Sequence, residues 1–134
     1  MVFEFISEGN HGPIPKLVVY SKTHLHNFYN LGFGDKDKVT GEIDDKVVTN
    51  NGDSQKVLAT VASTLYIFIE KFPEAMVFAI GSTRARTRLY RIGISNNLIE
   101  IQNDFEAYGL REDGWNIFEK ETEYEAFLVM KKKK

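Results

Sequence analysis

The spacing of apolar residues along the chain alternates between a strand-like and a helical period. Three short N-terminal segments are rich in β-branched and aromatic residues, which is typical of strands; they are 2–6, 16–21 and 27–33. After Asp53, apolar residues recur at steps of three and four as far as Phe72, which predicts an amphipathic helix ended by Pro73. Asp53 is expected to cap this helix with its carboxylate.

The second half predicts one more strand, an arginine-bearing helix and two closing strands. The segments are a strand at 75–80, a turn at Gly81-Ser82-Thr83, a helix with a buried stripe of Ala85, Leu89, Ile92 and Ile99, a break near Gly93 and 95–97, a short helical piece at 98–105, and strands at 105–110 and 124–130, with Gly114-Trp115 in the turn between them. The order β-β-β-α-β-α-β-β favours an α+β fold, with two main helices on one face of a mostly antiparallel sheet.

Size and composition predict a single domain. The chain has 134 residues, 43% of them hydrophobic and 27% charged, so we expect one globular domain over residues 1–130 and a basic tail at 131–134. The absence of cysteine excludes a disulfide scaffold and thiolate zinc sites. The net charge of −2 argues against a general polyanion binder. No signal peptide or membrane-spanning stretch is evident, which predicts a cytoplasmic protein with no membrane partner.

Arginine is concentrated at one place in this chain. Four of the five arginines lie between positions 84 and 91, directly after the strand that ends at Gly81. The planar guanidinium suits phosphate and carboxylate, so this placement suggests an anion site. The first helix and the strand at 75–80 must run antiparallel, which brings the starts of both helices to one rim of the domain. Helix starts present unpaired amide protons to an anion.

This rim predicts a ligand site and, separately, an arginine face. The candidate ligand-binding residues are Gly52, Asp53, Lys56, Gly81, Ser82, Thr83, Arg86 and Thr87. Arg84, Arg88 and Arg91 share another face of the helix, which is either solvated or meets a phosphate backbone or an acidic partner. The alternative for the rim is structural. Thr83 or Ser82 would then cap the second helix, and Asp53 would pair with Arg86 or Lys56 without any ligand.

Other groups of polar residues give weaker indications of chemistry. The acidic stretch from Asp35 to Asp53 is interpreted as a solvated loop, although converging carboxylates can hold Mg²⁺. His24 and His26 alternate near the first strands, but no third ligand is evident, so no metal site is assigned. Tyr20 and Tyr29 are candidates either for the core or for a base-stacking sheet face. The paired aspartates of a nucleotidyltransferase are missing after Ser82.

The combined motifs resemble a known family. Asn50-Asn51-Gly52-Asp53, Lys56 to Thr60, Phe72-Pro73, and Gly81-Ser82-Thr83 followed by Arg86-Thr87 and Leu89-Tyr90 are similar to an uncharacterised bacterial domain of unknown function, over about residues 15–130. The resemblance implies that the two helix starts are the signature regions of the family. It implies no activity, cofactor or catalytic residue.

Three functions are therefore open. The first is a binding module that recognises phosphate groups of a nucleotide or nucleic acid at the paired helix starts, with no cofactor. The second is a phosphodiesterase or nuclease at the same rim, which would need Mg²⁺. The third is a structural or partner-binding protein whose arginine face meets an acidic protein.

Overall fold

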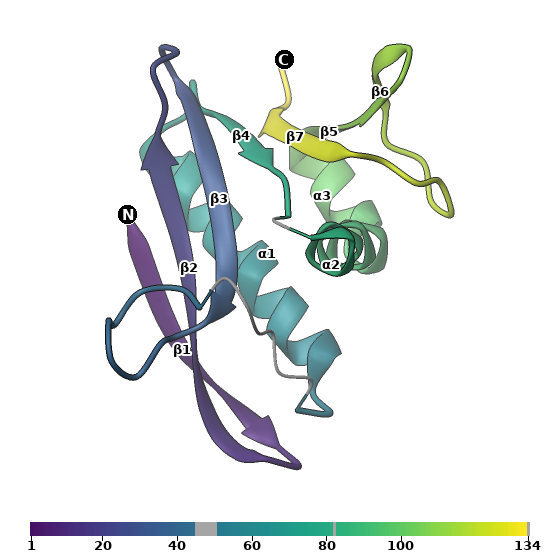
Figure 1. Cartoon of the computed structure of the whole chain (residues 1–134). Helices are drawn as coiled ribbons and strands as arrows, with labels where there is room; N and C mark the ends of the chain where they lie inside the picture. The colour runs from purple at the N-terminus through teal and green to yellow at the C-terminus, as the bar shows by residue number, and fades with distance from the viewer. Residues whose placement is uncertain (45–50, 82, 134) are drawn as a thin grey trace.

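A seven-stranded sheet forms the centre of the fold in the computed structural model, which describes residues 1–44, 51–81 and 83–133 (Figure 1). Along the sheet the strands are β1 (Val2–Gly9), β2 (Gly12–Lys22), β3 (Phe28–Asp35), β4 (Met76–Ala79), β7 (Ala126–Lys131), β5 (Phe105–Arg111) and β6 (Gly114–Ile117). Neighbouring strands pair antiparallel, except that β3 and β4 are parallel. The helices are α1 (Ser54–Lys71), α2 (Arg84–Asn96) and α3 (Leu98–Asp104). The predicted α+β class is confirmed.

Helix α1 is the crossover between the two parallel strands, since parallel neighbours cannot be joined by a tight turn. Its extent matches the predicted helix within a residue at each end. In Figure 1 it lies behind β2 and β3. The ring of Phe68 stacks on Tyr20 of β2, with centroids 4.2 Å apart, and Thr64 shares a 2.8 Å hydrogen bond with the Tyr20 hydroxyl. Tyr29 also packs edge-on against Phe68. Both tyrosines therefore belong to the core rather than to a stacking surface.

The buried face of α2 differs from the predicted stripe. Arg86 and Tyr90 are the helix residues that are buried, whereas Ala85 is exposed. Ile99, in α3, is 77% exposed. Leu89 and Ile92 of the predicted stripe are half-buried, so the prediction holds in part. Ala85 and Ile99 were wrong because apolar residues were assumed to point inward, while the deepest contacts of α2 are made by Tyr90 and Arg86.

The segment after β5 is a hairpin. The sequence interpretation placed Gly114-Trp115 in a turn, but these residues begin β6, which pairs with β5 through Leu110↔Trp115 and Tyr108↔Ile117. The turn lies earlier in the chain, between Arg111 and Gly114. Strand β6 has only four residues and begins with Gly114, which is typical of a turn, so it was not recognisable in the sequence.

The acidic segment after β3 folds back across the sheet. Lys36 and Ile43 form an isolated antiparallel bridge, and the Asp37 carboxylate accepts hydrogen bonds from the amides of Val39 and Thr40. These bonds stabilise the ionised carboxylate and lower the pKa of Asp37. Ile43 lies against the backbone of Gly32 and Gly34. The expectations for Asp45, Asn50 and Ser82 fall outside the described residues.

Candidate functional site: a charged groove beside helix α2

The start of α1 is bound to the hairpin formed by β1 and β2. Asn51 is 2% exposed, and its side-chain amide donates to Gly12 O at 2.8 Å and to Ser7 O and Oγ at 3.3 and 3.2 Å. Its side-chain oxygen accepts from the His11 amide at 2.6 Å. A Cβ atom at Gly9 would overlap the Asn51 carbonyl, so the contact requires glycine there. The motif at this helix start therefore fixes tertiary structure.

Asp53 takes part in the same contact; it occupies the N-cap position of α1, but its carboxylate does not bond to the helix amides. Its carboxylate accepts from Ser7 Oγ at 2.8 and 2.9 Å and from the Glu8 amide at 3.1 Å, and the helix has no side-chain cap. The predicted N-cap position is confirmed, whereas the predicted bond from the carboxylate to the helix amides is wrong, because the carboxylate accepts from a hydroxyl and an amide of β1 instead. Gly52 has a φ of +82°, which glycine adopts without strain. Lys56 is exposed on the first turn of α1.

The start of α2 is capped from within the chain. Thr83 Oγ1 accepts from the Arg86 amide at 3.2 Å, as one of the structural alternatives predicted. Thr87 Oγ1 accepts from the Gly81 amide at 3.1 Å and donates to Thr83 O at 3.1 Å. A Cβ at Gly81 would overlap the Thr87 amide nitrogen. Thr83 and Thr87 therefore use their hydroxyls to close the turn between β4 and α2.

Arg86 points into the fold, where it is 8% exposed. The pairing of β3 with β4 ends at Leu31↔Ala79, and beyond that point Arg86 Nη1 donates to Phe33 O at 3.3 Å. Its Nη2 donates to Asp44 O. The guanidinium thus occupies the edge of β3 that β4 leaves free, and it ties the returning 36–44 segment to that edge.

A buried ion pair joins β2 to β3, and it was not predicted from the sequence. Lys16, 1% exposed, pairs with Asp35, 8% exposed, at adjacent positions on β2 and β3. A lysine at the start of an apolar strand gives no sign in the sequence that it is buried. The one available signal for a buried lysine was Asp35, a carboxylate two positions after the end of the predicted neighbouring strand.

The two helix starts lie toward the same end of the sheet but on different strands. Asp53 holds α1 on β1 at Ser7, while Arg86 holds α2 on β3 at Phe33. Strand β2 separates β1 from β3, which corresponds to about 10 Å for two strand spacings. The hydrogen bonds of the Asp53 carboxylate go to Ser7 and Glu8 of β1, and not to Arg86 or Lys56.

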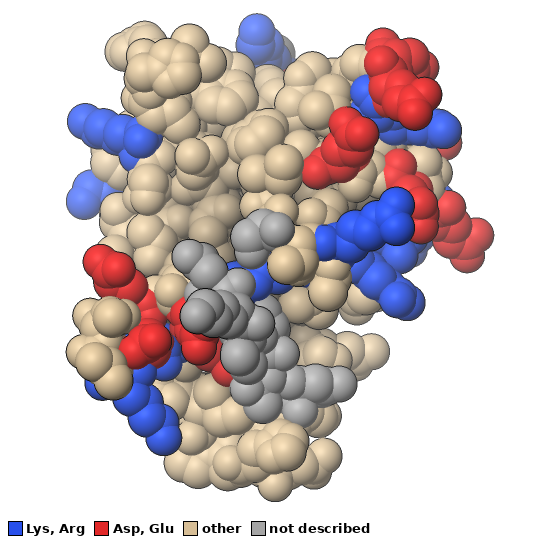
Figure 2. Space-filling model, viewed as in Figure 1, with Lys and Arg blue, Asp and Glu red and all other residues tan. Residues whose placement is uncertain are grey.

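The other arginines line an open groove between α2 and the β5–β6 hairpin. Arg84 and Arg88 are exposed and Arg91 is half-buried on the α2 side. The side opposite α2 is mostly acidic, with Glu112, Asp113, Glu123 and Glu125, and it also carries Arg111 at the end of β5. Figure 2 shows basic and acidic side chains side by side on the right of this face. Within the described ranges, none of the four arginines lies within 4.0 Å of a carboxylate.

The floor of this groove is formed by less polar residues. Leu110 and Tyr124 lie between the two charged walls, together with Ile80 and Gly81 at the end of β4. The groove measures ≈ 1380 Å³ and is open to solvent, which exceeds the roughly 300–1,000 Å³ of pockets that enclose a small ligand. The groove is therefore wider than a pocket that encloses a small ligand, and it has room for a nucleotide or for the end of a larger molecule.

No metal-binding group is evident in the part of the chain that the structure describes, where no three His, Cys, Asp or Glu side chains converge. His24 and His26 lie exposed in the turn before β3, and His11 lies exposed in the turn between β1 and β2. In the same part of the chain, no helix is long and apolar enough to cross a membrane.

The fold and the groove define a small α+β domain with helices on one face of its sheet and charged residues gathered beside α2. The chain belongs to DUF6934, a family of unknown function, whose model matches residues 1–132. Searches of curated proteins and of solved structures return no match.

Proposed function

We propose that the protein is a cytoplasmic binding module that recognises phosphate groups of a nucleotide or of a nucleic-acid end in the groove beside α2. The observation that carries the proposal is the arginine wall. Arg84, Arg88, Arg91 and Arg111 share one groove, and among the described residues none of them forms an ion pair with a carboxylate within 4.0 Å. Arginine presents paired donors to phosphate oxygens, so several guanidinium groups on one wall suit a phosphate ester.

This location differs from the rim of paired helix starts expected from the sequence. Arg86, Thr83 and Thr87 make hydrogen bonds within the fold, as does Asp53 at the start of α1. Among the candidate ligand-binding side chains, Lys56 remains exposed. We therefore assign the ligand to the three-arginine face of α2 instead of to the rim formed by the helix starts.

The acidic wall limits the ligands that fit. The groove is lined by four carboxylates and four guanidinium groups, so it has no net charge, and the whole chain carries −2. A long polyanion would place phosphates against both walls and be repelled by one of them. A nucleotide or a single phosphorylated end can lie against the arginines alone.

Binding of short ligands tests the proposal. We expect the protein to bind a labelled oligonucleotide with a 5′-phosphate, and nucleoside phosphates in competition, more tightly than the unphosphorylated oligonucleotide and with affinity that falls as salt rises. Arg84→Glu with Arg88→Glu should weaken binding by about tenfold or more, since each charged hydrogen bond contributes roughly 1.5–3 kcal/mol.

Lys56→Glu is the matched control, because Lys56 is exposed and lies at the start of the other helix. It should leave the affinity unchanged. Loss of binding in Lys56→Glu alone would place the ligand at the α1 start instead of the groove. No binding by the parent protein at low salt, or unchanged binding by the double arginine variant, would refute the function. Cleavage of the oligonucleotide that stops on chelation would favour the metal-dependent phosphodiesterase.

The acidic wall favours a second candidate, a protein partner with charges of both signs. A groove with facing basic and acidic walls can dock a segment whose own charges are in the reverse order. In this case Arg88→Glu and Glu123→Lys would each weaken a complex isolated with the parent protein. Phosphate binding would be unaffected by Glu123→Lys, which separates the two candidates.

A further inference from the structure

The sheet face turned away from the helices is apolar. The core side of the central strands is identified by buried Val77, Ala79, Phe127 and Val129. Because side chains alternate across a strand, the residues between them point to the opposite face. An antiparallel sheet with one solvated face ordinarily carries polar residues there. On the central strands β4 and β7, however, the outward positions hold Phe78, Leu128 and Met130.

Cross-strand pairing arranges these outward residues in rows. One row runs Asn30–Phe78–Leu128–Tyr108–Ile117 from β3 to β6. The next runs Ala126–Leu110–Trp115, with Ile80 directly after Ala79. Neither row contains a charged residue, and Figure 2 shows an uncharged surface over β4 and β7, with the charges toward the margin.

Several of these side chains are well exposed. Ile117 is 70% exposed, Ile80 54% and Trp115 42%. The ring of Phe78 contacts Phe28 at 5.8 Å and Trp115 at 6.0 Å between centroids, so aromatic rings run across the middle of the face. A continuous apolar surface of this kind marks an interaction site rather than a solvated face.

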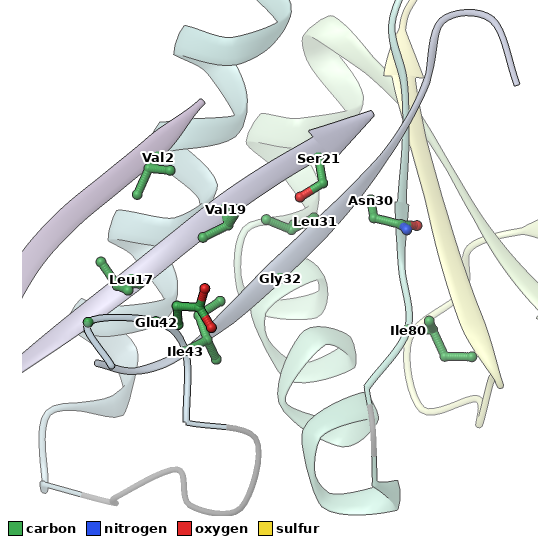
Figure 3. A pocket seen from close by; sticks show the side chains of 11 residues that line it. Val2, Leu17, Val19, Ser21, Asn30, Leu31, Gly32, Glu42, Ile43 and Ile80 are labelled. Carbon is green, nitrogen blue, oxygen red and sulfur yellow. The ribbon is translucent and has the colours of Figure 1, made fainter. Parts of the chain in front are cut away.

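The face also contains a depression on its other half. Figure 3 shows side chains of β1, β2 and β3, with Glu42 and Ile43 of the returning segment, surrounding a hollow in front of the sheet. Val2, Leu17 and Val19 give it apolar walls, and Ile80, directly after β4, closes it on the side of the sheet centre. The depression and the exposed β6 residues thus lie on opposite sides of the central strand.

We infer that this face is the interface between two copies of the chain. Strand β4 is the fourth of seven, with three strands on each side. A two-fold axis along β4 between two facing sheets would place β6 of one copy over the β1–β3 half of the other. Each copy would then set Ile117 and Trp115 toward the depression of its partner, which gives the reciprocal contacts that a symmetric dimer requires.

Area and charge support a second copy as the occupant. Seven strands span about 29 Å and six residues along them about 20 Å, which gives roughly 600 Å² per copy and 1,200 Å² in total, at the lower end for a stable interface. A nucleic acid would need basic residues beside the aromatic rings, and the two rows contain none. Charges on this face are few, with Glu42 beside the depression and Glu106 outside the two apolar rows, so another largely apolar face fits it best, and this chain supplies one.

The mass of the full chain in solution tests the inference. Light scattering after size exclusion should give about twice the 15.4 kDa monomer mass at high micromolar concentration. Ile117→Lys and Ile80→Lys should each return the mass to that of the monomer, because they place a charge in the apolar contact. Both side chains are exposed in one copy, so the monomer should remain folded by circular dichroism. Ile99→Lys is the matched control, since Ile99 is 77% exposed on α3, away from the sheet face, and should stay dimeric.

Trp115 gives a second readout, because it is the single tryptophan of the chain. Its emission should shift to longer wavelength on dilution and in Ile80→Lys, as dissociation exposes the ring to water. A monomeric parent at high concentration would overturn the inference. So would a dimer that survives Ile117→Lys and Ile80→Lys, or one that Ile99→Lys dissociates.

Discussion

Asn51→Ala should be among the most destabilising single substitutions in the chain. The side chain is fully buried and joins three separate backbone groups, the amide of His11 and the carbonyls of Ser7 and Gly12, across about 40 positions of sequence. Alanine would leave these groups facing one another with no room for bulk water. It would also remove the connection between the β1–β2 hairpin and α1.

The size of the loss in unfolding free energy follows from the hydrogen bonds that Asn51 makes. Two of them are short, at 2.6 and 2.8 Å, and a buried donor or acceptor left without a partner costs about 1–3 kcal/mol, so the expected loss of unfolding free energy is about 2–4 kcal/mol. Asn51→Asp should be at least as damaging, because a carboxylate oxygen would replace the amide that donates to Gly12 O and Ser7 O.

Urea unfolding followed by the fluorescence of Trp115 measures this loss. With an m value of about 2 kcal/mol/M, the midpoint of Asn51→Ala should fall by roughly 1–2 M at unchanged m. Asn103→Ala is the control, because Asn103 is exposed on α3, and it should stay within about 0.5 kcal/mol of the parent. A loss below about 0.5 kcal/mol for Asn51→Ala would refute the argument that this contact fixes the helix start.

Three further predictions concern buried groups. Lys16→Met should lower the unfolding free energy by about 3–5 kcal/mol in urea titrations, because it leaves Asp35 as a buried charge without its lysine; an effect under 1 kcal/mol would contradict the burial of the pair. Gly81→Ala should destabilise by more than about 1 kcal/mol in thermal melts, since the new methyl group meets the Thr87 amide, and a neutral result would mean that the β4–α2 turn is loose. Burial raises the pKa of Tyr90 from 10.0 to about 12, so its contribution to stability is fully present below pH 10 and is lost as pH rises toward 12. Tyr90→Phe should flatten that decline in unfolding free energy measured from pH 9 to 12, and an unchanged slope would disprove the assignment.

The sequence predicted the elements whose apolar period is regular. Helix α1 has seven buried residues at helical spacing and matched its prediction, and the strands β2, β5 and β7 were located within a few residues. Strand β6 was missed because its four residues begin with Gly114, which is typical of a turn, whereas β4, of the same length, is a continuous apolar run. The face of α2 was assigned wrongly because the residue that it buries deepest is an arginine, which any hydropathy pattern places outside.

The candidate site was harder to predict for a related reason. Side chains such as Asp53, Thr83 and Thr87 can equally bind a ligand or a neighbouring backbone group, and the sequence does not say which is nearer. Arg86 donates to the backbone carbonyls of Phe33 and Asp44, and such partners have no signature in the sequence. Arg84 and Arg88, in contrast, follow from helical spacing alone, since residues four apart share a face.

The glycines of β3 explain how the segment after that strand can lie across the sheet. Ile43 occupies the space above Gly32 and Gly34, and a Cβ at Gly34 would come within 2.9 Å of Ile43 Cγ2 and 3.1 Å of Arg86 Nη1. The isoleucine therefore fills the volume that side chains on β3 would otherwise occupy. A side chain at position 34 and a large residue at position 43 exclude each other, so we expect these positions to change together among relatives, with a small residue at 43 wherever 34 is not glycine.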